Sequence, residues 1–247
     1  MVSTPTTSTP ACTHGFIKAT CGDCHLKNLC LPLAMDIKDI GRLDKIIQRS
    51  SPIHVGDHLY RSGEAFRSIY AVRSGSLKTY IVDDNGVEQV TGFFLPGEVL
   101  GFDGIGSKTY AGNVMALETS MVCEIPFYRI EELSLQIASF QRHIFELMSL
   151  QIQTVNKMML TLSKKNAQGR IATFLICLSQ RFSRRNLSPN AIRLPMSRLD
   201  IGNYLGLTIE TVSRTFSRLH KEHVLSVDGR EVVIKDHVRL NQLCHSA

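Results

Sequence analysis

Short apolar runs cut by glycines characterise residues 53–127. The glycines stand at positions 56, 63, 75, 86, 92, 97 and 101. Between them, residues 68–72 and 77–82 are rich in β-branched and aromatic side chains, which predicts strands. Asp84, Asn85 and Gly86 follow the second run and predict a tight hairpin turn, because such turns need residues that tolerate positive φ. The pattern therefore predicts a small all-β roll or barrel.

After residue 130 the apolar spacing changes to three or four residues, which is typical of an amphipathic helix. The repeating positions are Leu133, Ile137, Phe140, Ile144, Leu147, Gln151, Val155, Met158 and Leu162. A helix of about 30 residues within 131–163 would be roughly 45 Å long at 1.5 Å per residue, more than a small domain can cover. We therefore predict that a second copy packs on it in a homodimer, through Ile144, Leu147, Val155, Met158 and Leu162. The alternative is a helix laid along its own β domain.

The last third of the chain carries a helix-turn-helix pattern. Residues 197–206 predict a short helix that ends at Gly206, and Thr208 is a good N-cap for a second helix over 209–221. In the second helix an apolar stripe follows helical spacing and should be buried: Val212, Phe216 and Leu219. Two short β-type runs around an Asp-Gly turn follow, at 224–227 and 231–234, and predict the wing of a winged helix.

The second helix of such a motif enters the major groove of DNA. Candidate DNA contacts are Thr208, Glu210, Ser213, Arg214, Ser217 and Arg218. Glu210 can accept a hydrogen bond from cytosine N4, and Arg214 can donate to guanine O6 and N7. Arg218 lies further along the helix and is better placed for phosphate. The alternative is a helical hairpin used only for packing.

Basic charge is concentrated in the same region. Residues 164–223 hold eleven Lys or Arg against three acidic residues, a balance of +8, whereas the whole chain carries +6. The remaining residues therefore sum to −2. A local excess of this size indicates a polyanion partner such as double-stranded DNA, because phosphate contacts dominate nucleic-acid affinity. A solvated basic face is the plainer alternative.

Seven cysteines are present, and three of them stand close together at Cys21, Cys24 and Cys30. An odd count and tight spacing favour metal binding or redox chemistry over a disulfide framework. Three thiolates are an incomplete set for a metal that takes four ligands, and the residues alone suit zinc and iron–sulfur equally.

Residues 1–20 lack a signal-peptide pattern and predict a disordered lead, and no membrane span is apparent, so we expect a cytoplasmic protein.

These sequence patterns divide the chain into a lead (1–20), a cysteine segment with a β-roll (21–130), a dimerisation helix (131–163) and a DNA-binding domain (164–247). The resulting α+β architecture of cyclic-nucleotide-binding-like β-roll, long helix and winged helix-turn-helix resembles the family of the cyclic AMP receptor protein (CRP) and the fumarate and nitrate reduction regulator (FNR). Five segments resemble the FNR branch in detail: 91–93, 99–106, 116–126, 162–167 and 200–208.

The resemblance implies that Cys123 joins Cys21, Cys24 and Cys30 as the fourth ligand of one [4Fe–4S] cluster per subunit. It also implies a transcription regulator whose dimer binds palindromic sites of the form TTGAT with its inverted partner, and whose cluster is destroyed by oxygen. Contacts with RNA polymerase would come from exposed loops, with these candidates: Asp84, Gly86, Thr119 and Met121. A zinc-stabilised or small-molecule-sensing regulator without an oxygen response is the alternative.

Two functions are disfavoured. Nucleotide-binding members of the family hold the cyclic phosphate with an arginine placed after a Gly-Glu turn. This chain has Gly97 and Glu98, but residues 107–118 contain no arginine and offer only Lys108, so no cyclic AMP binding is expected. No glycine-rich phosphate loop, catalytic triad or paired-carboxylate cleft is apparent either, so we do not expect an enzyme.

Overall fold

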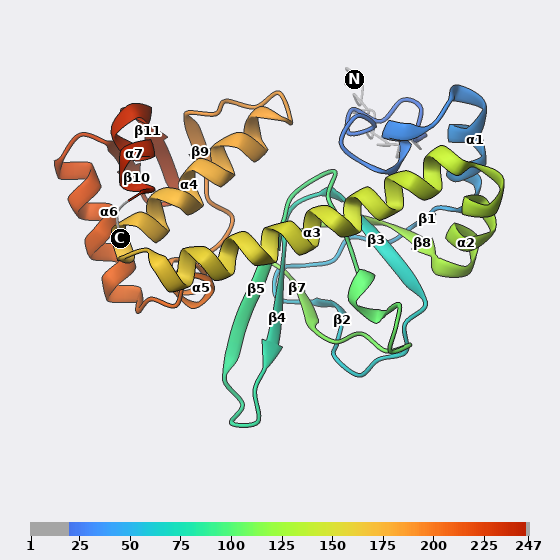
Figure 1. Cartoon of the computed structure of the whole chain (residues 1–247), viewed down its shortest axis with the longest axis horizontal. Helices are drawn as coiled ribbons and strands as arrows, with labels where there is room; N and C mark the ends of the chain where they lie inside the picture. The colour runs from blue at the N-terminus through green and yellow to red at the C-terminus, as the bar shows by residue number, and fades with distance from the viewer. Residues whose placement is uncertain (1–19, 246–247) are drawn as a thin grey trace, which may run out of the picture.

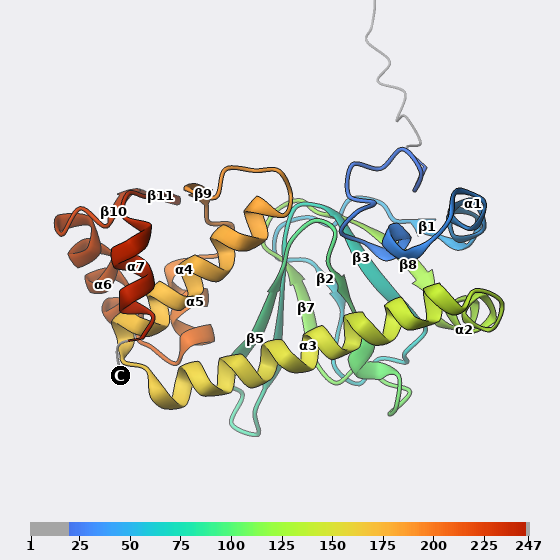
Figure 2. The ribbon, with the colours of Figure 1, turned by 45° about the horizontal axis from the view of Figure 1, so that its top comes forward.

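The computed structural model describes residues 20–245. The predicted lead therefore lies outside the described residues, apart from Thr20. Figures 1 and 2 show an elongated molecule in which one long helix, α3 (Ala138–Lys164), runs along the longest axis. A β-roll lies over the first part of this helix, and a C-terminal domain folds back at its far end. Among the described residues, no helix has the length and apolar character needed to cross a bilayer.

The predicted β-roll is confirmed and consists of two four-stranded antiparallel sheets. One sheet has the order β1-β8-β3-β6 and the other β2-β7-β4-β5. The strands are β1 (Gln48–Arg49), β2 (His58–Tyr60), β3 (Ser68–Ser74), β4 (Leu77–Val82), β5 (Glu88–Phe94), β6 (Val99–Leu100), β7 (Asn113–Ala116) and β8 (Met121–Pro126), with a 3₁₀ turn, η2 (Phe102–Gly104), after β6. The β4–β5 turn forms because the Asp83 carboxylate accepts from the backbone N–H of Asn85 and Val87, while Gly86 supplies a φ of 80°.

Three tyrosines fill the space between the two sheets. Tyr60, Tyr70 and Tyr110 are 4%, 9% and 3% exposed. The rings of Tyr60 and Tyr110 stack with their centroids 3.8 Å apart. The Tyr110 hydroxyl also donates to the backbone carbonyl of Ser68 at 2.8 Å, so this polar group is satisfied in the core. The interior of the roll is therefore occupied by its own side chains.

The helical region differs from the single predicted helix. It consists of α2 (Phe127–Gln136) and α3, separated at Ile137, whose backbone is extended (φ −130°, ψ 93°). Ile137 is buried, and its neighbours in the apolar pattern, Leu133 and Phe140, enter the same core under the β1-β8-β3-β6 sheet. The apolar spacing continues across the break because both helices pack on one core, which is why the sequence pattern did not reveal it.

The segment before the roll and the C-terminal domain complete the structure. Residues after the cysteine segment form a 3₁₀ turn, η1 (Leu31–Ala34), and α1 (Ile37–Ile46). The C-terminal domain contains α4 (Ala167–Ser183), β9 (Ala191–Arg193), α5 (Arg198–Leu205), α6 (Ile209–Lys221), β10 (Leu225–Asp228), β11 (Glu231–Ile234) and α7 (His237–Leu243). Its antiparallel sheet has the order β10-β11-β9, so the predicted wing hairpin gains a third strand.

Candidate DNA-reading surface and cysteine pocket

Local hydrogen bonds fix the turn between α5 and α6. Ser197 and Asp200 form a reciprocal capping box at the start of α5. Gly206 ends α5 in the left-handed conformation (φ 62°), and Thr208 then caps α6 by accepting from the N–H of Thr211 at 3.2 Å. Gly202 is equally constrained, since a Cβ there would lie 2.6 Å from the carbonyl oxygen of Leu207. The predicted helix-turn-helix is confirmed.

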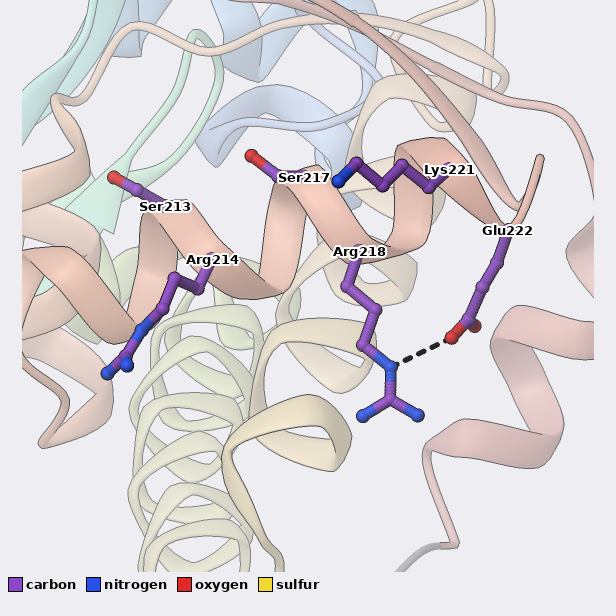
Figure 3. Close-up of a pocket in the computed structure, with 6 residues that line it drawn as sticks. All are labelled: Ser213, Arg214, Ser217, Arg218, Lys221 and Glu222. Atoms are coloured by element: carbon purple, nitrogen blue, oxygen red, sulfur yellow. Dashed lines mark hydrogen bonds and ion pairs between the residues drawn. The ribbon is translucent and has the colours of Figure 1, made fainter.

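The free side of α6 carries the predicted polar residues. Figure 3 shows a surface pocket along this side, lined by Ser213, Arg214, Ser217, Arg218, Lys221 and Glu222. Arg218 Nε donates to Glu222 Oε1 at 2.8 Å, a contact that the sequence analysis missed although its i,i+4 spacing could have indicated it. Hydrogen bonds from its own backbone N–H and from Thr208 lower the pKa of the Glu210 carboxyl, which suits a charged acceptor in the first turn of α6.

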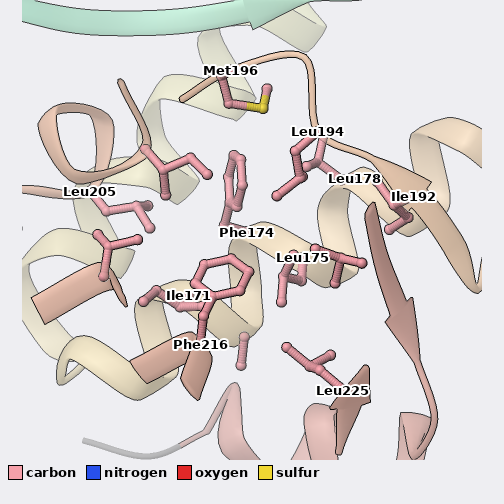
Figure 4. Packing of buried hydrophobic residues seen from close by; sticks show 14 of the residues in the cluster. Ile171, Phe174, Leu175, Leu178, Ile192, Leu194, Met196, Leu205, Phe216 and Leu225 are labelled. Atoms are coloured by element: carbon pink, nitrogen blue, oxygen red, sulfur yellow. The ribbon is translucent and has the colours of Figure 1, made fainter. Parts of the chain in front are cut away.

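The opposite side of α6 anchors it to the domain. Val212, Phe216 and Leu219 are at most 2% exposed, as predicted, and Figure 4 shows Phe216 among the buried residues of α4, β10 and the loop after β9. Arg198 at the start of α5 places its guanidinium 3.6 Å from the centroid of the Phe216 ring. The same guanidinium lies 3.4 Å from the carbonyl oxygen of Gly229 in the wing. Arg198 therefore ties the first helix, the second helix and the wing together, a role the sequence analysis missed.

The four candidate thiols line one pocket. Cys21, Cys24 and Cys30 come from the loop before η1, and Cys123 comes from β8, where it pairs with Ala71 of β3. The start of the cysteine loop is fixed because the N–H of Cys21 donates to Asp44 Oδ1 of α1 at 2.9 Å. Two cationic side chains, Lys27 and Arg73, also line the pocket.

Burial favours the protonated forms of Cys21, Cys30 and Cys123. It raises the pKa of both Cys21 and Cys30 to about 12. Burial also raises the pKa of Cys123, although Arg73 and Arg49 act in the opposite direction. Without a bound metal, Cys21 and Cys30 are therefore neutral thiols at pH 7. A bound metal would favour the thiolate forms, since coordination deprotonates a thiol.

The four thiols are a suitable donor set for a metal cluster, but the pocket that they line is narrow. Its volume is about 30 Å³, which is room for water molecules but for little more. Within the described residues, no group of three or more Cys, His, Asp or Glu side chains is gathered at the spacing of a single-ion site. A [4Fe–4S] cluster would need more room between the four thiols than a single ion, and the cysteine loop is the part of the lining that would have to provide it.

The residues that follow the cysteine loop pack directly on the long helix α3. Leu31, which follows Cys30, is fully buried in the same core cluster as Phe140 and Ile144, and η1 lies against α3. A second connection runs through the sheet: Cys123 pairs with Ala71, Ala71 pairs with Val99, and the Val99 carbonyl accepts from the Gln151 side chain at 2.8 Å. Gln151, the polar residue that interrupts the apolar pattern of the helix, therefore bonds α3 to the roll.

The predicted dimerisation residues do not form one exposed face. Ile144 is only 6% exposed, and Leu147 packs against the same core of the β-roll, while Met158 packs against the core of the C-terminal domain. Leu162 is half-buried, and only Val155 is exposed, at 59%. The apolar residues that α3 leaves exposed are instead Phe145, Leu150, Ile152, Val155, Met159 and Leu160. Heptad-like spacing joins four of them: Phe145, Ile152, Val155 and Met159.

The candidate polymerase contacts lie on two loops. Asp84 and Gly86 are exposed at the tip of the β4–β5 hairpin, which Figure 1 shows projecting from the roll. Thr119 is exposed in the loop before β8, and Met121 is half-buried at the start of that strand.

Comparison with known proteins decides the family. Residues 52–136 match the cyclic nucleotide-binding domain, and residues 169–243 match the Crp-like helix-turn-helix domain. The transcriptional activator protein FnrA of Stutzerimonas stutzeri is 49% identical over 230 residues, which cover 93% of this chain and 94% of that protein. The chain belongs to the CRP/FNR family.

Further relatives support the FNR branch. The fumarate and nitrate reduction regulatory protein of Escherichia coli is 45% identical to this FNR-type regulator over 90% of the chain and 89% of that protein. The solved structure of FixK2 from Bradyrhizobium japonicum covers 82% of this chain and 99% of its own, with a TM-score of 0.74 and 29% identity. The resemblance predicted from the sequence is confirmed. This FNR-type regulator is a DNA-binding transcription regulator, and its relatives are regulators rather than enzymes.

Proposed function

We propose that this FNR-type regulator is an oxygen-responsive transcription activator that holds one [4Fe–4S] cluster per subunit through Cys21, Cys24, Cys30 and Cys123. The observation that supports this most directly is that these four cysteines, one of them about a hundred residues from the rest, line a single pocket. The pocket adjoins the residues that pack on α3, so a change in the cysteine loop can reach the long helix.

The residues around the pocket have distinct roles in this proposal. When bound, the cluster supplies a metal centre that persists without oxygen and breaks down in its presence. The four cysteines act as thiolates, and Lys27 and Arg73 offset their negative charge. Asp44 holds the beginning of the loop through the N–H of Cys21, and Leu31 anchors its end in the core beside α3.

The exposed apolar stripe of α3 is the surface on which a second copy would pack. Phe145, Ile152, Val155 and Met159 are between 59% and 65% exposed. Two α3 helices packed along this stripe would place two copies of α6 on successive half-sites of a palindrome, as helix-turn-helix dimers require. Cluster loading would favour this dimer, and contacts with RNA polymerase would come from the loops that carry Asp84, Gly86, Thr119 and Met121.

A zinc-stabilised regulator without oxygen sensing is the competing function. The four thiols suit zinc as well as iron–sulfur, and the similarity to fumarate and nitrate reduction regulatory proteins is what favours the cluster. Response to cyclic AMP receives less support still. Tyr60, Tyr70 and Tyr110 fill the roll, the Glu98 carboxylate is bound to two arginines, and Lys108 is exposed with a φ of 63°.

A visible spectrum of anaerobically purified protein, with iron and sulfide analysis, tests the proposal. We expect about four iron and four sulfide per chain and a charge-transfer band that air removes. Cys123→Ser should abolish the band, whereas the matched control Cys177→Ser, at an exposed cysteine of α4, should retain it. Zinc in place of iron, or an unchanged spectrum for Cys123→Ser, would contradict the proposal.

A further inference from the structure

The turn at Gly97 and Glu98 lies between the cysteine loop and the DNA-reading domain. On one side the loop presses against Gly97: a Cβ there would lie 3.0 Å from Cβ of Leu29 and 3.8 Å from Cβ of Leu26. Gly97 also has a φ of 89°, which a larger residue rarely adopts. Any outward movement of the cysteine loop therefore changes what this turn packs against.

On its other side the turn is bonded to α4. The Glu98 carboxylate accepts from Arg181 Nε at 2.9 Å and Nη2 at 2.5 Å, and from Arg185 Nη2 at 2.7 Å. The same arginines reach backbone carbonyls beside the turn, Arg181 at Phe93 (2.6 Å) and Arg185 at Pro96 (2.8 Å). Burial raises the pKa of the Glu98 carboxyl, but Arg181 and then Arg185 outweigh it, so this pKa lies below its usual range.

These bonds join two domains rather than two parts of one. Arg181 lies in the last turn of α4 and Arg185 in the turn that follows it, and the buried face of α4 forms the core under α6, whereas Glu98 precedes β6 of the roll. Phe93 of β5 also enters that core, where its ring meets Phe174 of α4 and Tyr204 of α5 at centroid distances of 6.1 and 5.1 Å. A shift of the turn would therefore be passed to the helices that carry the DNA-reading surface.

Other bonds between the domains lie further from the loop. Lys78 of β4 pairs with Asp200 of α5 at 2.9 Å, and Asn203 of α5 bonds to the backbone of β5 at Glu88 and Val90. The Arg193–Glu118 pair, at 2.7 Å, is more exposed, with 62% of the arginine side chain open to solvent. Of these carboxylates, only Glu98 is next to a residue that the cysteine loop contacts, which makes Glu118 a matched control.

We propose that Glu98 is a positioning residue that couples the cysteine loop to the DNA-reading domain. The pocket must widen to take a cluster, and the loop that lines it rests on the turn that carries Glu98. Movement of the loop shifts the turn, and the Arg181 and Arg185 bonds carry that shift to α4 and so to α6. This inference depends on the proposed function in one respect only: that function names the [4Fe–4S] cluster as the group whose binding would widen the pocket.

A double-mutant cycle in metal-free protein tests the coupling without any iron. Leu29→Ala removes Cδ1 of Leu29, which lies 3.6 Å from where a Cβ on Gly97 would stand, and so weakens the contact of the loop with the turn while keeping Cβ. Glu98→Gln removes the charge that holds the arginines. The readout is amide hydrogen exchange in residues 176–185 of the full chain. We expect Leu29→Ala to speed exchange several-fold when Glu98 is present and to add less than twofold in the Glu98→Gln background. In the Glu118→Gln control, Leu29→Ala should keep its full effect. Independent effects of Leu29→Ala and Glu98→Gln would overturn the proposal.

Cluster-loaded protein provides the second arm. In the unaltered chain and in Glu118→Gln, cluster loading should change amide hydrogen exchange in residues 176–185 and raise DNA affinity. In Glu98→Gln both responses should be at least fivefold smaller, while the iron content stays the same. If Glu98→Gln does not fold, Arg181→Lys, which cannot make the two-pronged contact, replaces it. A protein that shows the coupled cycle but binds no iron would refute the proposed function and leave this coupling intact. Full loading responses in Glu98→Gln would refute the coupling.

Discussion

The DNA-reading domain and the cysteine pocket are built in opposite ways. The domain gathers residues 167–243 around an apolar core to which the roll adds Phe93 of β5, with helix ends fixed by neighbouring caps such as Ser197 and Thr208. The pocket brings one loop to a strand about a hundred residues away, and burial raises the pKa of two of its thiols to about 12. The first region is held together by short-range caps and apolar packing, whereas the second contains donor groups whose charged forms need a ligand. A change at the pocket can therefore alter the second region while the local structure of the first is kept.

The largest effect should come from opening the core of the reading domain. Phe216→Ala removes a side chain that is 2% exposed and supports both α6 and Arg198. We expect a loss of about 3–5 kcal/mol in the free energy of unfolding of this domain, measured by denaturant titration, and loss of DNA binding. Iron content after anaerobic loading should persist. Val238→Ala, at a site 70% exposed on α7, should change stability by less than about 0.5 kcal/mol. A small effect of Phe216→Ala would contradict this picture of the core.

The next effect concerns the exposed apolar stripe of α3, on which a second copy would pack. Ile152→Asp places a carboxylate on the exposed stripe of α3, where a two-fold dimer would bring it near its copy. We expect the dimer dissociation constant of loaded protein, from sedimentation equilibrium, to rise about 100-fold, which corresponds to about 2.7 kcal/mol. Ile37→Asp, on a side chain 90% exposed at the start of α1, is the control and should leave it unchanged. An intact Ile152→Asp dimer would place the dimer surface elsewhere.

Within the reading surface, the two arginines of α6 should behave differently. Arg214→Ala should weaken binding by about 1–3 kcal/mol at the preferred site and relax the preference for one base pair. Arg218→Ala should weaken binding to all sequences alike and reduce the salt slope by about 1. Binding titrations on preferred and single-substituted sites at several salt concentrations separate these outcomes. If Arg214→Ala weakens binding to every site equally, Arg214 contacts phosphate rather than a base.

A smaller effect should appear in the pH dependence of metal-free protein. The pKa of Cys21 and Cys30 is raised in the folded state, so the stability they confer is complete below pH 9 and is lost as the pH rises from about 9 to about 12. Relative to Cys21→Ser/Cys30→Ser, the unaltered chain should lose about 1 kcal/mol per thiol between pH 8 and pH 10, measured by denaturant titration. Parallel profiles for the two proteins would show that these thiols are not held neutral by burial.

The accuracy of the sequence predictions followed the range of the interactions involved. The helix-turn-helix and the β4–β5 turn were predicted correctly because their signals are local: Gly206 ends one helix and Thr208 begins the next, and the Asp83 carboxylate closes the hairpin on the N–H groups of Asn85 and Val87. The break at Ile137 was missed because α2 and α3 present their apolar residues to one core, so the spacing runs on through a non-helical residue.

Long-range packing accounts for what the sequence did not reveal. Helical spacing identified which residues of α3 are apolar, but only the packed structure shows that Ile144 and Leu147 face the roll while Ile152 and Val155 face solvent. The fourth cysteine was supplied by family resemblance, since nothing in the spacing of Cys123 relates it to Cys21. The partners of Glu98 are more than eighty residues away, and no local pattern indicates them.

One measurement tests the central claim most directly: equilibrium titration of palindromic FNR-type DNA with the same sample before and after exposure to air, with iron determined in parallel. Coupling energies between linked sites typically reach 1–3 kcal/mol. The account therefore predicts that affinity falls by about 10-fold to 100-fold as iron is lost, and that Cys123→Ser gives the low value both before and after air. Equal affinity of the iron-containing and air-exposed samples would contradict it.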